Sequence, residues 1–446
     1  MIQYGAVPYV IAWLGLAGIL RKFLGSWLTP PAYCALYWGI LATVNLFFPD
    51  YPMGEAGLLY ILEVLSLFGL GHLLSSKASV HENTIKSGLA HPRERRFPAI
   101  RITLVTCAIA SATYTMLIAK SPEIDIANPP LYLQLLLTLQ FFGPMLGGVA
   151  VGLNALDKKD KWYAALTLVG SFMLSVGFGG RTAFIGPLLL LTTAYLAGTI
   201  CLRPHQTPLI SLKRLAYVSV AVAALSVYAT AVYTIRGALS HNSVRTVLEV
   251  PNLAQVLTDP DKFSRSFDNV GGQLEGQVGM FTQVFVQFWR DPAFTPNWGR
   301  YSLMGPIKLL GLREAENNPV YYGPNVAQNV YTIFPPALQD FGVTGSFVYW
   351  LFLGLISGYF WERARRGWAS GCMVVLFILM NLQIGTTFML RYNSVILAYL
   401  YCLIYAGYSD SQRSRHLSGT SGRQRFGRGS LPSRASGTLP YFKIPY

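Results

Sequence analysis

The chain has 446 residues, of which 52% are hydrophobic and only 12% are charged. With a positive mean hydropathy, this balance is typical of a membrane protein and excludes an ordinary soluble enzyme. The net charge of +15 would suggest a nucleic-acid partner in a soluble protein. Here the basic residues lie in short loops and in the C-terminal tail, so we expect contact with anionic membrane lipid and no nucleic acid.

The first apolar stretch is followed by Arg21-Lys22 and not by a small-residue cleavage site, which predicts a retained first helix. The cysteines all lie in or next to apolar stretches, so we expect neither a disulfide framework nor a metal site. They are Cys34, Cys107, Cys201, Cys372 and Cys402.

A transmembrane helix needs about 20 apolar residues, and we count eleven candidate stretches. The sequence therefore predicts an all-α polytopic membrane protein. The candidate spans are 2–20, 31–48, 57–75, 102–119, 131–153, 162–178, 183–201, 215–235, 341–360, 369–388 and 393–408.

These spans divide the chain into four parts. Residues 1–235 form a membrane bundle of helices 1 to 8, and residues 341–408 add helices 9 to 11. Residues 236–340 form one long polar loop between the two membrane parts. Residues 409–446 are rich in Ser, Gly and Arg, which predicts a disordered basic tail.

The basic residues are distributed unevenly between the two sides of the predicted bundle. One set of short loops holds seventeen Lys and Arg residues, and the opposite set holds only Lys120, Arg181 and Arg391. The positive-inside rule therefore places the N-terminus outside and the C-terminus in the cytoplasm. The long loop is then external, or periplasmic in a cell with two membranes.

The long loop contains an apolar pattern with helical spacing. This pattern predicts an amphipathic helix that lies either on the membrane or on the helix bundle. Its residues are Val278, Phe281, Val284, Phe285, Phe288 and Trp289.

Three arginines are candidates for binding an anionic substrate at the outer face. Arg181 lies in the turn Gly179-Gly180-Arg181-Thr182, on the side where basic residues are scarce, and Arg391 lies in a similar turn. Arg236 ends a predicted helix and opens the long loop. Guanidinium groups bind phosphate or pyrophosphate bidentately. The alternative is that each arginine is solvated, contacts lipid phosphate or stabilises a helix end. Arg245 and Arg300 in the loop are weaker candidates, because surface arginines are more often solvated or salt-bridged.

Three residues are candidates for a general base. Asp340 stands where the long loop re-enters the membrane, and its alternative role is to cap the next helix. Glu63 lies well inside a predicted span, so we expect it to face the bundle interior or a water-filled cavity. His241 in the loop is weaker. Other polar residues inside spans are expected to hydrogen-bond between helices, namely His72, Gln140, Asn381 and Gln383. No nucleotide-binding, hydrolase or metal-binding motif is present, so no cofactor is expected.

Three motifs resemble those of the Wzy-type O-antigen polymerases, which polymerise oligosaccharide repeat units. They are Gly179-Gly180-Arg181-Thr182-Ala183, Asn329-Val330-Tyr331-Thr332 with Gln339-Asp340-Phe341-Gly342-Val343-Thr344-Gly345, and Leu390-Arg391-Tyr392-Asn393. The layout resembles this family over the whole chain except the tail.

The resemblance implies a bundle similar to C-type membrane glycosyltransferases in the bacterial inner membrane. It implies a metal-independent enzyme that joins undecaprenyl-pyrophosphate-linked repeat units of O-antigen, capsule or exopolysaccharide on the periplasmic side. Arg181 and Arg391 match the family's functional arginines, and Arg236 matches by position only. A chain-length regulator protein is a further candidate partner. The alternatives are an O-antigen ligase, although the loop has only His241 where ligases carry several histidines, and a flippase or transporter of lipid-linked sugars.

Overall fold

The computed structural model describes most of the predicted spans and a few residues between them. The continuous ranges are 3–47, 53–81, 99–120, 130–178, 181–202, 333–366, 368–384 and 393–426. The separate residues are 227–228, 230–231, 234, 259–261, 278, 281–282, 285, 321–322 and 327–328.

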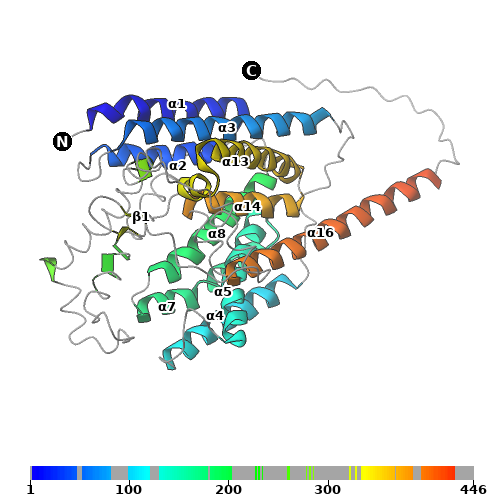
Figure 1. Cartoon of the computed structure of the whole chain (residues 1–446). Helices are drawn as coiled ribbons and strands as arrows, with labels where there is room; N and C mark the ends of the chain where they lie inside the picture. The colour runs from blue at the N-terminus through cyan, green and yellow to red at the C-terminus, as the bar shows by residue number, and fades with distance from the viewer. Residues whose placement is uncertain are drawn as a thin grey trace, which may run out of the picture.

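The described part of the chain is almost entirely helical (Figure 1). In chain order it contains η1 (Tyr4–Ala6), α1 (Val7–Leu24), α2 (Pro30–Asn45), α3 (Glu55–His81), α4 (Ile100–Lys120), α5 (Leu131–Gly152), η3 (Lys158–Asp160), α6 (Trp162–Leu166), α7 (Val169–Phe178), α8 (Arg181–Leu202), α13 (Phe334–Arg365), α14 (Ala369–Ile384) and α16 (Asn393–Phe426). Two short antiparallel strands, β1 (Tyr321–Tyr322) and β2 (Ala327–Gln328), pair Tyr321 with Gln328.

Among the described residues, five helices are long and apolar enough to cross a membrane. They are Tyr4–Leu24, Glu55–Ser76, Ile100–Lys120, Leu131–Gly152 and Phe334–Arg365, and shorter apolar helices cover Phe184–Thr199, Ala369–Met380 and Ser394–Tyr408. The protein is therefore an α-helical membrane protein, as its composition predicted. The count of eleven spans stays a prediction.

The buried side chains form two large clusters, and α13 and α14 contribute to both. One cluster packs α1, α2 and α3 against α13 around Trp13, Trp38 and Trp350. The other packs α4, α5 and α8 against α14 and α16. In Figure 1, α1, α2, α3 and α13 form the upper layer, and α4, α5, α7 and α8 lie below them.

Glycines allow close contact in two parallel helix pairs. A Cβ added at Gly71 of α3 or at Gly354 of α13 would overlap the main chain of the other helix. In the pair of α5 and α8, a Cβ at Gly198 would lie 2.8 Å from the carbonyl oxygen of Val149. Small residues at such crossings let helix backbones approach, which is how helices associate in membranes.

Two expectations about the helices need correction. The predicted span 162–178 is not one continuous helix, because α6 ends at Leu166 and α7 begins at Val169, and between them the Leu168 N–H donates to the carbonyl of Ala165 at 3.0 Å, three residues back. Its crossing of the membrane stays a prediction. The tail was expected to be disordered from residue 409, yet α16 continues to Phe426. Adding residues to an existing helix needs no new nucleus, and no proline interrupts this stretch.

The cysteine expectation also needs correction. Cys34, Cys107 and Cys402 are free and buried, as expected for cysteines in apolar spans. Cys372, however, is disulfide-bonded. Spacing along the chain did not reveal this, because helix packing and not sequence distance brings cysteines of different spans together.

Candidate functional site

The most distinctive feature of the described bundle is a break near the start of α13. Gly342 has φ 68° and ψ −175°, a backbone conformation that residues other than glycine rarely adopt. Before the break, a short helical segment runs from Phe334 to Phe341, and its residues 334 to 340 are all buried. Pro335 in the first turn favours the start of this segment, because its missing N–H has no helical partner there. The sequence thus produces a short buried helix followed by a long one.

Asp340 lies two residues before this break and is completely buried, with 0% of its surface exposed. Asp340 has interactions within the protein, and its carboxyl group interacts electrostatically with Tyr349, whose ring stacks on that of Phe341. A buried carboxylate needs such partners, because burying an isolated charge is costly. This burial tests neither of the roles predicted for Asp340, catalysis and capping of the longer helix, and both stay predictions.

Residues of the long loop pack against the same end of the bundle. Val278, Phe281, Thr282 and Phe285 are helical and buried. The Thr282 hydroxyl accepts a hydrogen bond of 2.9 Å from the N–H of Gly54, just before α3. At these described residues, the predicted amphipathic helix lies on the bundle.

Aromatic contacts connect this loop helix to the broken segment of α13. The ring centroids of Phe281 and Phe334 are 5.3 Å apart, and those of Tyr60 and Phe285 are 4.7 Å apart. The Tyr60 hydroxyl donates a buried hydrogen bond of 2.8 Å to Ser346, four residues after the break. The loop helix, α3 and both sides of the break therefore form one packed unit.

Hydrogen bonds from Gln3 close the same end of the bundle. The Gln3 amide nitrogen donates to the carbonyl of Asn45 at 3.0 Å, and its Oε1 accepts from the N–H of Met53 at 2.8 Å. These bonds join the start of α1, the end of α2 and the start of α3. We call this the Asp340 end, defined by Gln3, Asn45, Gly54, Thr282 and Asp340.

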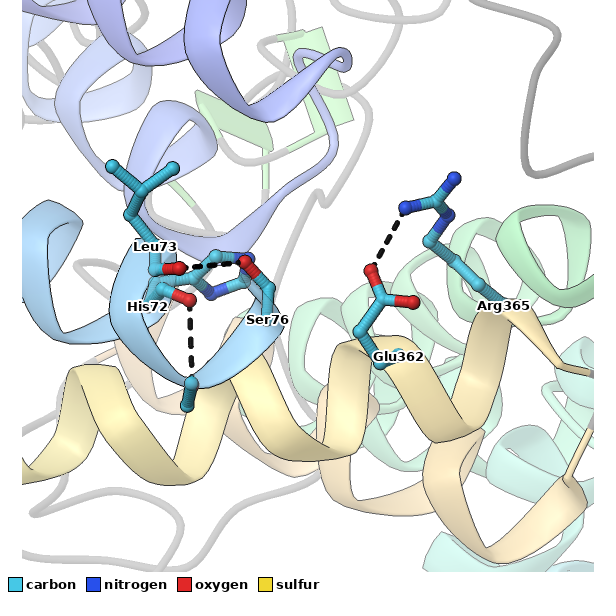
Figure 2. A network of polar contacts seen from close by, with 6 residues as sticks. His72, Leu73, Ser76, Glu362 and Arg365 are labelled. Atoms are coloured by element: carbon cyan, nitrogen blue, oxygen red, sulfur yellow. Dashed lines mark hydrogen bonds and ion pairs between the residues drawn. The ribbon is translucent and has the colours of Figure 1, made fainter. Parts of the chain in front are cut away.

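At the opposite end of α13, the charged residues have structural partners. Glu362 and Arg365 form an ion pair of 2.8 Å, which Figure 2 shows beside His72 and Ser76 of α3. Asp410 of α16 caps α14 by accepting hydrogen bonds from the N–H groups of Ala369 and Ser370 at 2.8 and 3.0 Å. These carboxylates therefore stabilise helix ends and turns.

Glu63 does not lie where the sequence predicted. We expected a carboxylate inside a span to face the bundle interior or a water-filled cavity, and the side chain of Glu63 is exposed on the side of α3 that does not face the bundle interior. The inner side of α3 is formed by Tyr60, Val64 and Phe68, which pack on the loop helix and α13. Glu63 is therefore not part of the Asp340 end, and its role as a base stays an untested prediction.

The predicted arginines are only partly located. Arg181 begins α8, and α7 ends at Phe178, so Arg181 lies between these two helices as expected, while Gly179 and Gly180 lie outside the described residues. The other predicted site residues lie outside the described residues, namely Arg236, His241, Arg245, Arg300 and Arg391.

Two of the four polar residues predicted to bond between helices do so, and the side chains of the other two, Asn381 and Gln383, lie outside what the structure describes. The Gln140 amide donates to Ser171 at 2.8 Å, and His72 Nδ1 lies 2.9 Å from the Ser357 hydroxyl. The contributions of Tyr60, Ser346 and Tyr349 near the break were missed. A tyrosine or serine within an apolar span is common, so its type alone gave no signal.

Together, these features define an α-helical membrane protein with a buried carboxylate at a helix break beneath a docked loop segment. Among the described residues, no three His, Cys, Asp or Glu side chains come together in a way that could hold a metal ion. No protein-family model matches the sequence, and no curated protein or solved structure is significantly similar to it.

Proposed function

We propose that this protein polymerises undecaprenyl-pyrophosphate-linked oligosaccharide repeat units at the periplasmic face of a bacterial inner membrane, producing O-antigen, capsule or exopolysaccharide. The observation that carries the proposal is Asp340, buried at a helix break where part of the long loop packs on the bundle. Broken helices in membranes occur where the irregular backbone is surrounded by protein or lines a cavity, and they often mark binding sites.

The proposed reaction is a glycosyl transfer by direct displacement. A hydroxyl oxygen of the incoming repeat unit attacks the anomeric carbon of the growing chain. The bond from that carbon to the pyrophosphate oxygen breaks, and undecaprenyl pyrophosphate leaves. Asp340 accepts the proton of the attacking hydroxyl. Glu63 plays no part in this scheme, and His241 remains a second candidate base.

Arginines stabilise the negative charge that develops on the leaving pyrophosphate. Arg181 and Arg391 are the main candidates, with Arg236, Arg245 and Arg300 as further contacts. The substrate is already activated, so the scheme needs neither a metal ion nor another cofactor. The long loop orients the two sugars, which lowers the entropic barrier to their reaction.

The proposed topology has eleven spans in a bundle similar to C-type glycosyltransferases, with the N-terminus in the periplasm and the C-terminus in the cytoplasm. Its support is the position of basic residues. Arg101 lies at the start of α4, Lys158 follows the end of α5, and Arg363 lies in the last turn of α13. The positive-inside rule assigns these three helix ends to the cytoplasm.

The test is the length of polysaccharide made by cells that lack the native protein and carry a plasmid copy. Wild type should give a ladder of repeat lengths. Asp340→Asn keeps the shape of the side chain but removes the base, so polymerisation should fall by roughly 10²–10⁴-fold. Asp340→Glu should retain partial activity. Asp157→Asn is the matched control, because Asp157 is 72% exposed and belongs to the opposite end.

Membrane levels and thermal stability of all variants are measured first, so that loss of folding is recognised. A normal ladder from Asp340→Asn at equal protein level would exclude Asp340 as the base. A normal ladder from Arg181→Ala would exclude Arg181 from pyrophosphate binding. If a null strain accumulates polymer on the carrier lipid, the protein is a ligase. If repeat units stay on the cytoplasmic face, it is a flippase or transporter.

A further inference from the structure

The exposed position of Glu63 needs its own explanation. The apolar helix Glu55–Ser76 has 22 residues. At a rise of 1.5 Å per residue it is about 33 Å long, close to the ~30 Å hydrocarbon core of a bilayer. Glu63 lies eight residues after Glu55, which is about 12 Å along the helix. Its side chain is too short to return to the polar interface from there.

Glu63 has no hydrogen bond or ion pair in the described part of the protein. A carboxyl group inside the membrane is costly unless another polar group satisfies it, and such groups almost always face protein or water. Other exposed side chains well inside the described spans are uncharged, for example Ile109 and Thr106 of α4 and Val348 of α13. The surface around Glu63 is therefore different from an ordinary lipid-facing surface.

Glu63 belongs to a continuous stripe on the outer side of α3, at spacings of three and four residues. We call it the Glu63 stripe, and it consists of Leu59, Glu63, Ser66, Leu70 and Leu74. The Ser66 hydroxyl donates to the carbonyl of Leu62 at 2.7 Å, so its oxygen can still accept a bond from outside. The stripe thus has a polar centre, with leucines before and after it, which resembles the interior of a helix–helix interface.

The neighbouring helix α1 lies parallel to α3 at the same edge of the bundle (Figure 1), with Gly5 against Glu55 and Leu20 against Gly69. On α1, Ala12 and Gly15 are exposed, and a Cβ added at Gly15 would meet no atom within 4 Å. The backbone of α1 is therefore not covered by other parts of the protein at these two positions.

We infer that the Glu63 stripe is the contact surface between two copies of this chain in the membrane. A two-fold axis along the membrane normal brings residues of equal depth together and gives a closed, self-complementary contact. It places Glu63 opposite Glu63 or Ser66 of the second copy. Two carboxyl groups that share a proton act as donor and acceptor for each other, and a serine hydroxyl accepts from a protonated carboxyl.

The second copy is the occupant that complementarity favours. The stripe supplies both the donor and the acceptor that Glu63 requires at its own depth, so no group from another protein is needed. A contact between this stripe and a different surface of the next copy would not close and would extend into a chain of molecules. This interface is independent of the proposed enzymatic activity.

The test is disulfide cross-linking of the full-length chain in native membranes, with two differently tagged copies expressed together. Ser66→Cys and Leu59→Cys should each form an oxidised species of twice the chain mass that contains both tags. The unmodified chain is the first control, because its own cysteines must give no such species. Ile109→Cys is the matched control, because Ile109 is 62% exposed on another helix.

A second pair of variants tests the role of the carboxyl group in the Ser66→Cys background. Glu63→Gln keeps a donor and an acceptor and should retain cross-linking. Glu63→Leu removes two symmetric hydrogen bonds, which should raise the dimer dissociation constant by roughly sevenfold. This loss is measured as a lower cross-linked fraction at low expression.

The inference is overturned if Ser66→Cys cross-links no more than Ile109→Cys. It is also overturned if the cross-linked species contains a different protein, or if Glu63→Leu leaves the cross-linked fraction unchanged. Membrane levels and thermal stability of Glu63→Leu are compared with those of Glu63→Gln, so that a loss of folding is not mistaken for a loss of dimerisation.

Discussion

Gly57→Ala is expected to loosen the contact between the long loop and the bundle. Gly57 lies in the first turn of α3, directly beneath Thr282 of the loop helix. A Cβ added there would lie 2.6 Å from the Cα of Thr282 and 2.9 Å from its carbonyl oxygen. Because the nearest atom belongs to the backbone, no side-chain rotation relieves this overlap.

The size of the effect follows from these distances. Ordinary contact begins at 3.4 Å, so the loop helix must move outward by about 0.8 Å, the difference from 2.6 Å. Overpacking of this kind costs about 1–3 kcal/mol, and alanine returns about 0.5–1 kcal/mol through its better helix propensity. The Gly54–Thr282 hydrogen bond of 2.9 Å is stretched by the same movement. We therefore expect a net loss of about 1–2 kcal/mol, which raises the population of the undocked loop by roughly 5–30-fold.

The assay is the rate at which trypsin cleaves the long loop in proteoliposomes, which follows the undocked population when opening is fast. Gly407→Ala in α16 is the control, because a Cβ there meets no atom within 4 Å. It should leave the cleavage rate of the loop at the wild-type value. Equal cleavage rates for the two variants would refute the docking of the loop helix on Gly57.

Variants at three further places test packing elsewhere, each measured as the free energy of unfolding in mixed micelles. Ser346→Ala leaves the buried Tyr60 hydroxyl without its acceptor and should cost about 1–3 kcal/mol, whereas Tyr60→Phe should cost less because Ser346 still donates to Val343. Equal losses would contradict that reasoning. Asp410→Ala removes the cap of α14 and should cost about 0.5–2 kcal/mol, and Asp410→Asn should recover part of it. An unchanged stability would show that the cap is unimportant. Gly198→Ala should destabilise the pair of α5 and α8 by about 1–3 kcal/mol, because the added Cβ meets the backbone of Val149; a stabilised variant would contradict this packing.

The apolar spans and the loop helix could be predicted from the sequence because they depend on local patterns. Runs of about 20 apolar residues identify α3, α5 and α13. The spacing of Val278, Phe281 and Phe285 predicted the face that is now buried. In each case the signal lies within a single segment.

The orientation of Glu63 could not be predicted, because apolar residues occur on every side of α3 and no amphipathic pattern shows which face is inside. The face is decided by shape, since Gly71 allows α13 to approach and Gly57 allows the loop helix to approach. The break at Gly342 was hidden for a similar reason. A glycine within an apolar span is compatible with both a straight helix and a break, and only packing distinguishes them.

The directions of the helices connect the two candidate groups of the proposed site. In a membrane protein, parallel helices must be separated by an odd number of crossings. α5 and α8 are parallel, and α6 with α7 supplies the crossing between them, so Arg181 lies at the end opposite to Lys158 and Lys159. In α13, Asp340 lies at the end opposite to Arg363 and Arg365. If these basic residues are cytoplasmic, as the positive-inside rule predicts, Arg181 and Asp340 face the same outer side. A base and a pyrophosphate-binding group on one side are what the proposed transfer requires, although their elements belong to different clusters of the bundle.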